Sequence, residues 1–465
     1  MSRSLEHTEV LRLRAVKQEQ QEAAAKRRRN VLVYGIWLYF LLIIFEGALR
    51  KWFLPSLATP LLIVRDPIAI FLLLYAWYYN MFPRSGYIVW MTIITIISIF
   101  TTLFLAHGNL YVTIYGARIF LIHFPLVFLI GSVLNRDDVL KIGRVALWIS
   151  IPMAILVAMQ FYSPQSAWVN RGVGGDMGGA GFGGAMGYFR PPGTFSFTNG
   201  LVAFFTFAAA YIFYFWLRPG QINKVILICA TIGLIFTIPF SISRTLTFSV
   251  SLMVLFVIIT VARNVKLMGR IIVGLVGFAV LITLISKTGW IDTPMEVFLK
   301  RFEQAGDTEG GVEGTLGDRY FGGMLKAILK AGENPFFGEG LGLGTNAGAA
   351  IFGVKGVFLV AEEEWARTIG EMGALLGISV IFIRLSIAFR LAVASYFEIS
   401  VGNVLPWMLL SFCIIIFPQG AWAQPTMLGF STLITGLLMA SLREPNKPKV
   451  DSVGITTNGE NELKA

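Results

Sequence analysis

The sequence is poor in charge. Only 14% of its 465 residues are Asp, Glu, Lys or Arg, whereas 55% are hydrophobic. A soluble domain of average composition carries about 25% charged residues, and the mean hydropathy of this chain is +0.70. These values exclude an ordinary soluble globular fold and indicate that much of the chain lies in lipid.

Cysteine and histidine are scarce as well. Cys229 and Cys413 both lie in apolar runs, so they make neither a disulfide framework nor a metal site. His7, His107 and His123 do not form a ligand set. No glycine-rich run ends in Gly-Lys-Ser or Gly-Lys-Thr, as a nucleotide phosphate loop does. We therefore predict no metal and no cofactor.

Long apolar runs make up most of the chain. A helix needs about 20 apolar residues to cross the hydrocarbon core, and lipid leaves unpaired backbone groups without a partner. The runs predict an all-α fold, a polytopic membrane bundle of about twelve transmembrane helices with a large outer loop that contains short amphipathic helices. The predicted spans are 31–47, 60–79, 87–106, 113–134, 145–163, 194–216, 224–240, 245–262, 271–287, 368–393, 403–418 and 425–441.

The distribution of Lys and Arg predicts the orientation. Connections expected on the inner side carry basic residues, whereas the outer connections around 107–112 and 418–424 carry none. Cytoplasmic loops are enriched in Lys and Arg, so both termini are predicted to be cytoplasmic. The net charge of +11 follows from this pattern and does not indicate nucleic-acid binding. No cleavable signal peptide is expected, because the first apolar run begins at Val31 behind a charged tail.

This topology divides the chain into five parts. They are a basic tail 1–30 that can contact anionic lipid headgroups, nine spans within 31–286 that include an outer glycine-rich loop 164–193, a large outer loop 287–367, three spans within 368–441, and a tail 442–465. We interpret the glycine-rich loop as a mobile flap. In the large loop, Asp318 is expected to cap a helix that ends near Ala331. Glu363, Arg367 and Glu371 share one face of the next helix.

Several basic residues interrupt the pattern because they fall at, or just inside, the outer ends of spans. They are Arg50, Lys51, Arg65, Arg118, Arg190, Arg244 and Arg367. An arginine at a helix centre costs about 2.5–3.5 kcal/mol on insertion scales, so ionisable groups in spans usually face a cavity or a partner. A shared polar cavity that opens outward would explain their similar depth.

Local ion pairs are an alternative explanation for some of these residues. Asp66 directly follows Arg65, and Glu46 precedes Arg50 by four residues. Arg190 and Arg244, in contrast, have no acidic neighbour within four residues. An unpaired guanidinium suits bidentate binding of phosphate.

The loop motifs resemble those of the O-antigen polymerase/ligase superfamily, a group of GT-C-like membrane glycosyltransferases. The matching segments are Arg190-Pro-Pro-Gly-Thr-Phe-Ser-Phe-Thr-Asn199, Ser243-Arg244-Thr, Gly317-Asp-Arg319, Asn334-Pro-Phe-Phe-Gly-Glu-Gly-Leu-Gly-Leu-Gly344 and Glu371-Met-Gly373. They cover roughly residues 190–380 in the order expected around a large outer loop.

The resemblance implies metal-independent transfer of a glycan from a polyprenyl diphosphate carrier on the outer face of a bacterial inner membrane. By analogy, the diphosphate is expected to be bound by Arg190 and Arg244, with Arg65, Arg118 and Arg367 as further candidates. Arg319 is expected to be a catalytic residue that helps to stabilise the charge of the leaving diphosphate. Ligases of this family carry a histidine in the large loop, but this chain has none after His123. We therefore predict a polymerase, with Glu363 or Glu364 as the general base.

The predicted substrate is a polyprenyl-diphosphate-linked oligosaccharide within membrane lipid, and the predicted partners are a chain-length regulator and a flippase. Two rival functions stay open. One is a ligase that uses a base other than histidine, and the other is a transporter or flippase for lipid-linked glycans. A transporter is expected to hold its functional charges near the bilayer midplane, in discontinuous helices.

Overall fold

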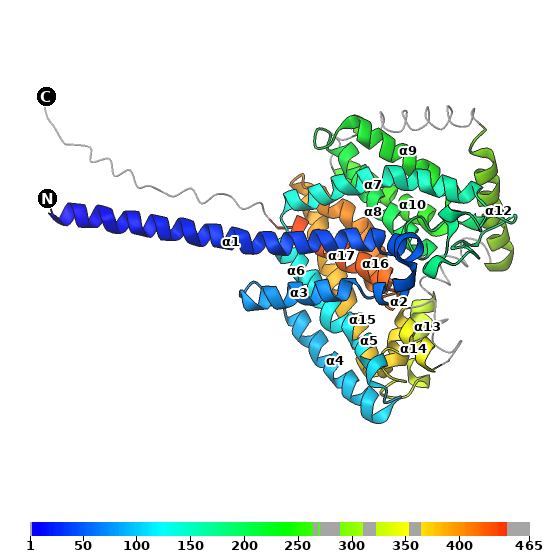
Figure 1. Ribbon diagram of the computed structural model, residues 1–465, viewed down its shortest axis with the longest axis horizontal. Helices are drawn as coiled ribbons and strands as arrows, with labels where there is room; N and C mark the ends of the chain where they lie inside the picture. The colour runs from blue at the N-terminus through cyan, green and yellow to red at the C-terminus, as the bar shows by residue number, and fades with distance from the viewer. Residues whose placement is uncertain (1, 264–267, 270–288, 310–321, 353–363, 444–465) are drawn as a thin grey trace.

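The computed structural model describes residues 2–263, 268–269, 289–309, 322–352 and 364–443. These residues form a helical bundle from which one long helix projects (Figure 1). In the described part of the chain, eight helices are long and apolar enough to cross a membrane, and three shorter apolar helices, Lys224–Phe240, Leu405–Gln419 and Pro425–Ser441, lie among them. The prediction of an all-α, multi-pass membrane bundle is confirmed by helix length and hydropathy. Span 271–287 lies outside the described residues, so the count of twelve stays a prediction.

The helices follow the predicted spans closely. Their bounds are α1 (Ser2–Ala48), α2 (Ala58–Leu61), α3 (Arg65–Tyr78), α4 (Gly86–Leu105), α5 (Leu110–Arg118), α6 (Phe124–Val133), α7 (Arg136–Tyr162), α8 (Thr198–Leu217), α9 (Lys224–Phe240), α10 (Arg244–Arg263), α12 (Asp292–Glu309), α13 (Gly323–Leu329), α14 (Asn346–Phe352), α15 (Glu364–Ser400), α16 (Leu405–Gln419) and α17 (Pro425–Ser441). Two π-helical segments, η1 (Leu49–Phe53) and η3 (Ile119–His123), extend α1 and α5. The strands β1 (Phe182–Gly183) and β2 (Phe189–Arg190) pair antiparallel.

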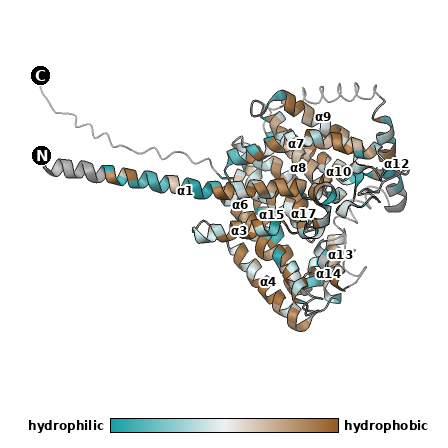
Figure 2. Cartoon of the chain, viewed as in Figure 1, coloured by the Kyte–Doolittle hydropathy of each residue, from teal (hydrophilic) through white to brown (hydrophobic). Residues whose placement is uncertain are grey.

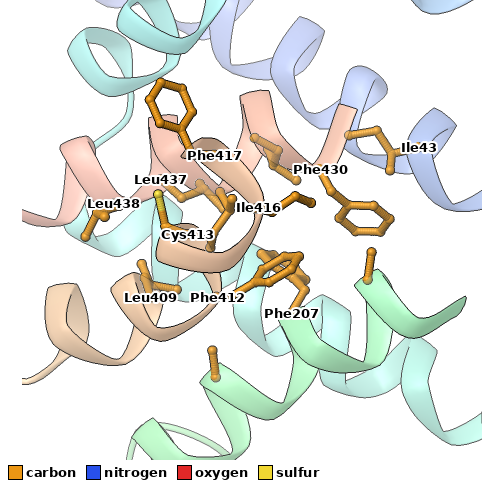
Figure 3. Close-up of a cluster of buried hydrophobic side chains, with 14 of the residues drawn as sticks. Ile43, Phe207, Leu409, Phe412, Cys413, Ile416, Phe417, Phe430, Leu437 and Leu438 are labelled. Carbon is orange, nitrogen blue, oxygen red and sulfur yellow. The ribbon is translucent and has the colours of Figure 1, made fainter. Parts of the chain in front are cut away.

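The centre of the bundle is an aromatic cluster contributed by three helices. Phe207 of α8, Phe412 of α16 and Phe430 of α17 lie with ring centroids 6.3–6.4 Å apart, and Figure 3 shows them with Cys413 and their aliphatic neighbours. Cys413 is fully buried and contacts Thr435, and the structure records both cysteines as free thiols. In lipid, helices associate mainly through close van der Waals packing.

Small residues bring α6 and α17 together. A Cβ atom added at Gly436 would lie 2.6 Å from the Cβ of Ile130, and one at Gly131 would lie 2.7 Å from the Cβ of Met439. Both approaches are too short for a real side chain. Glycine at these positions therefore permits the close helix contact, as small residues commonly do in membrane bundles.

The first half of α1 projects from the bundle and contains many hydrophilic residues (Figure 2). Its residues from Arg12 to Arg28 are almost all exposed. The helix joins the bundle where Arg29 pairs with Asp138, the N3 residue in the capping box of α7, and where Arg28 lies 4.6 Å from the Tyr79 ring centroid. The basic end of the tail is thereby held against the inner-side connection predicted from the sequence.

The short helix of the large loop packs against α15. Within the described residues it is α13, and Asp318, its expected cap, lies outside them. From the sequence, Phe321, Met324, Leu325, Ile328 and Leu329 form one apolar face of a helix that lies on the membrane surface or on the bundle. Ala327 belongs to a buried cluster with Trp365 and Ile369 of α15, and Met324 packs against this cluster. Leu325 and Leu329 are exposed.

Candidate anion-binding site

The segment that begins at Arg190 is fixed to the bundle. The side chain of Gln160, on α7, accepts a hydrogen bond from the Gly193 amide at 2.8 Å and donates one to the Gly193 carbonyl at 3.1 Å. The Thr194 hydroxyl donates to the Ile44 carbonyl of α1 at 2.7 Å. The chain just before the glycine run is anchored as well, because Nδ2 of Asn170 lies 3.0–3.1 Å from three carbonyl oxygens around the end of α7. That the glycine-rich loop is a mobile flap stays a prediction.

Three arginines from separate elements gather at this segment. Arg190 lies in β2, Arg244 is the first residue of α10, and Arg301 belongs to α12. Burial lowers the pKa of Arg190, and the positive charges of Arg301 and Arg244 lower it further. Within the described part of the chain, the buried Nε of Arg190 makes no hydrogen bond and no carboxylate pairs with this residue. We call these residues the three-arginine site.

Such a site favours a bound anion. Desolvation and like charges both oppose the protonated form of a guanidinium, and a phosphate oxygen would relieve both by accepting charge-assisted hydrogen bonds. The sequence analysis singled out Arg190 and Arg244 but missed Arg301. Its signal was the pair Lys300-Arg301 on a loop predicted to be outside, where the positive-inside rule does not expect basic residues.

Arg65 and Arg118 belong to a second group, deep between α1, α3 and α5. Arg65 pairs with Glu46 of α1 at 3.1 Å rather than with its neighbour Asp66. Asp66 accepts hydrogen bonds from Arg118 at 2.7 and 2.9 Å and from His123 at 2.9 Å. The alternative of ion pairing is realised, but mostly between helices far apart in the sequence.

Arg50 and Lys51 join this group to the segment after Arg190. Arg50 lies 3.6 Å from Glu46 and donates to the Ser196 hydroxyl at 2.9 Å. Lys51 donates to the Gly193 carbonyl at 2.6 Å. We call the group the buried cationic cluster; it consists of Glu46, Arg50, Lys51, Arg65, Asp66, Arg118 and His123, all at most 8% exposed. The basic residues expected to line one cavity therefore fall into separate groups.

Arg367 lies in a third group that is closed. Its Nη1 pairs with Glu371 at 2.7 Å, and its Nε and Nη2 pair with Glu364 at 3.0 and 2.7 Å. Glu364 also accepts from Arg384 at 3.1 Å and from the Trp422 amide at 3.0 Å. Both oxygens of Glu364 and all three nitrogens of Arg367 are engaged, so neither side chain offers a free group to a substrate. We call Glu364, Arg367, Glu371 and Arg384 the Glu364 network.

Arg384 is a further member of this network that no sequence pattern singles out. It is fully buried, and its guanidinium carbon lies 3.9 Å from the Trp422 ring centroid. It also donates to the carbonyls of Phe417 and Gly420, where α16 ends. No local pattern could reveal this, because its partners lie 20–36 residues away in the sequence.

The glycine-rich segment 334–345 connects the Glu364 network to α4 and α5. The Gly344 amide donates to Glu371, and the Leu341 amide donates to Thr102 of α4. α15 breaks at Gly373, where φ is 79° and an added Cβ would lie 2.0 Å from the Phe336 carbonyl oxygen. The glycines let two backbones touch, which explains their number without a bound nucleotide.

Two predicted site residues, Arg319 and Glu363, lie outside the described residues, so their roles stay predictions. Among the residues that the structure describes, no group of three or more His, Cys, Asp or Glu side chains is placed to hold a metal ion. No protein-family model matches the chain, and no curated protein matches it either.

Proposed function

We propose that the protein is a membrane glycosyltransferase that polymerises oligosaccharide repeat units carried on polyprenyl diphosphate. The observation that supports this best is the three-arginine site, in which Arg190, Arg244 and Arg301 combine their charges beside a segment anchored to the bundle. A diphosphate is the anion that such a set suits, because several guanidinium groups can each bind two of its oxygens.

The reaction forms one glycosidic bond and breaks one bond between a sugar and a phosphate. A hydroxyl oxygen of the acceptor glycan attacks the anomeric carbon of the donor, and the bond from that carbon to the diphosphate oxygen breaks. The electron pair leaves with the polyprenyl diphosphate, and the hydroxyl proton passes to a base. Negative charge grows on the leaving diphosphate, where fixed arginines stabilise it most strongly in the transition state.

The Glu364 network bears on the choice of base. Both oxygens of Glu364 accept hydrogen bonds, from two guanidinium groups and a backbone amide, so neither oxygen is free to approach an acceptor hydroxyl. Of the two carboxylates considered, Glu363 is therefore the base that we propose. Arg319 is proposed to act near the reacting groups, and Arg367 is assigned to holding Glu364 and Glu371 in place.

The proposed location is the plasma membrane of a bacterium, with both termini cytoplasmic and the reaction on the outer face. A flippase would deliver the substrate, and a chain-length regulator would limit the product.

A transporter of lipid-linked glycans is a second candidate, and two observations favour it. α15 is interrupted at Gly373, and ion pairs such as Asp66–Arg118 lie inside predicted spans; transporters often share both features. The three-arginine site favours the enzyme instead, since Arg190 and Arg301 come from segments outside the spans.

Purified protein incubated with a lipid-linked repeat unit distinguishes these functions. A ladder of products on a gel supports a polymerase, and one transfer to a different acceptor supports a ligase. The enzyme proposal is wrong if no new glycosidic bond forms. Replacing Arg190, Arg244 or Arg301 by Gln should each lower the rate about 100- to 1000-fold, the usual loss for a transition-state charge contact.

The matched control is Arg390→Gln. This arginine is exposed on α15, where its side chain contacts Tyr87. It makes the same chemical change away from the three-arginine site and should leave the rate near that of the wild type. Full activity of both Arg190→Gln and Arg244→Gln would show that the diphosphate site is misplaced.

A further inference from the structure

The buried cationic cluster carries more positive than negative charge. Among the described residues, Arg50, Lys51, Arg65 and Arg118 face two carboxylates, Glu46 and Asp66, and all six residues are buried. A neutral His123 adds no charge to the cluster. In the tautomer that carries its proton on Nε2, this N–H donates to Asp66 and Nδ1 accepts from the Tyr39 hydroxyl, both at 2.9 Å. With Lys51 protonated, the cluster has an excess of two positive charges. Burying an unpaired ion costs several kcal/mol.

The Glu364 network provides an internal comparison. Two arginines there face two glutamates, so that network is neutral. In it, no guanidinium nitrogen of Arg367 or Arg384 is among the described buried atoms without a hydrogen bond. The Glu364 network is therefore neutral, whereas the buried cationic cluster carries a net positive charge. An ion-pair network that serves only to join helices has no physical reason to keep the excess.

Hydrogen-bond donors are also left over in the buried cationic cluster. Arg65 Nη1, Arg118 Nη2 and the Tyr115 hydroxyl are buried and make no hydrogen bond among the described residues. Lys51 contacts only neutral groups there, the Gly193 carbonyl and the Trp52 ring at 4.5 Å. Buried polar groups are nearly always satisfied in native proteins, so each exception needs an explanation. Acceptor oxygens of an anion would satisfy these donors.

The backbone at the cluster is irregular. η1 carries Arg50 and Lys51, and η3 begins directly after Arg118 and ends at His123. Short π-helical segments are rare and occur frequently at functional sites, where they redirect side chains at the cost of regular helical hydrogen bonds. Both segments carry or directly adjoin residues of the buried cationic cluster.

We propose that the buried cationic cluster is a second anion site, which binds the diphosphate of the acceptor's lipid carrier. The inference rests on the proposed function, because a polymerase of lipid-linked repeat units handles two lipid diphosphates, one that leaves and one that is retained. The three-arginine site takes the leaving diphosphate. The positive charge of the buried cationic cluster matches that of a dianion such as a diphosphate. Its unused hydrogen-bond donors on α3 and α5 can bind the diphosphate oxygens.

The two sites are joined by the segment 190–196. Its first residue belongs to the three-arginine site, whereas Gly193 and Ser196 accept hydrogen bonds from Lys51 and Arg50. An anion that binds the remaining donors of Lys51 shares the ammonium group with the Gly193 carbonyl and so alters one restraint on the segment. Occupation of the second site is therefore expected to change the affinity of the first.

Equilibrium binding of radiolabelled farnesyl diphosphate to the full-length protein in nanodiscs tests the proposal. The wild type should bind two molecules. Arg190→Gln should lose one site and keep the other. Lys51→Met should lose the other, with binding there at least tenfold weaker, because it removes half of the excess charge. Within the described residues Lys51 pairs with no carboxylate, so its replacement leaves none of their buried anions unpaired and should not prevent folding.

A second variant tests the same site independently of whether Lys51→Met folds. Tyr115→Phe keeps the ring, whose centroid lies 4.0 Å from the Arg118 guanidinium carbon, and removes only the unused hydroxyl. It should weaken the second site about threefold to tenfold. Inorganic pyrophosphate should compete at the same site, which shows that the diphosphate and not the polyprenyl chain is recognised.

The possible outcomes separate this proposal from the proposed function. A wild type that binds one molecule, lost in Arg190→Gln and unchanged in Lys51→Met, overturns the second site and leaves the polymerase proposal intact. Two sites that survive in both Lys51→Met and Tyr115→Phe overturn it as well. The same holds if phosphatidylglycerol in the nanodisc occupies the cluster and farnesyl diphosphate cannot displace it. Full polymerase activity of Arg190→Gln, with a second site lost in Lys51→Met, contradicts only the first site.

Discussion

Removing the Glu364 carboxylate should destabilise the protein strongly. Glu364→Ala takes away the acceptor of four hydrogen bonds, two from Arg367, one from Arg384 and one from the Trp422 amide. Arg367 keeps Glu371, whereas Arg384 keeps only carbonyl acceptors. The net charge of the Glu364 network becomes positive in a fully buried place.

The expected loss of stability depends on which partners Arg384 keeps in this variant. Removing one partner of a buried ion pair costs about 3–5 kcal/mol, mostly because the other charge stays buried without compensation. Summing the four lost hydrogen bonds separately would overestimate the effect, since they form one unit. Glu364→Ala is therefore expected to lower the free energy of unfolding by about 3–5 kcal/mol. The double variant Glu364→Ala/Arg384→Met should recover part of this loss, because it also removes the buried guanidinium that has lost its carboxylate partner.

Unfolding of detergent-solubilised protein by a titration with sodium dodecyl sulfate, followed by tryptophan fluorescence, measures these differences. Glu339→Ala is the matched control, since Glu339 is exposed beside the same network. Its effect should stay within about 0.5 kcal/mol. The reasoning is refuted if Glu364→Gln unfolds like the wild type but makes no polymer, because Glu364 would then be a catalytic base and not a structural anion.

Three further predictions concern backbone contacts, side-chain placement and metal. Gly373→Ala should reduce the free energy of unfolding by at least about 1–3 kcal/mol, the usual cost of a disfavoured backbone conformation. The reason is that φ is 79° there and the new Cβ would lie 2.0 Å from the Phe336 carbonyl oxygen. An unchanged unfolding midpoint would contradict this prediction. Gly429→Ala should displace the Arg65 guanidinium, whose Nη1 would lie 1.9 Å from the new Cβ, and so weaken farnesyl diphosphate binding at the buried cationic cluster. Gly86→Ala is the matched control, because an added Cβ there would meet nothing within 4 Å. Treatment with EDTA should leave the rate of polymerisation unchanged, and a loss restored by Mg²⁺ would disprove the metal-independent mechanism.

The separate groups of basic residues show how far local patterns reach. Unusual depth in the spans identified Arg50, Lys51, Arg65, Arg118 and Arg367 as residues that need a partner. That criterion cannot tell a closed network from a cationic one, because both place arginines near acids in the sequence. Arg367 has Glu371 four residues away and is fully paired. Arg65 has Asp66 beside it and pairs elsewhere.

The sequence alone determined that this is an all-α membrane protein, where its apolar helices lie, and that Arg190 has no local acidic partner. Hydropathy over about 20 residues is a local property, so it follows directly from the sequence. Tertiary structure decided which charges meet. Arg118 reaches Asp66 across 52 residues, and Arg50 reaches Ser196 across 146. Arg301 joins Arg190 only through the fold. Such contacts depend on how helices pack, and helix packing is set by side-chain shape over the whole bundle rather than by any one segment.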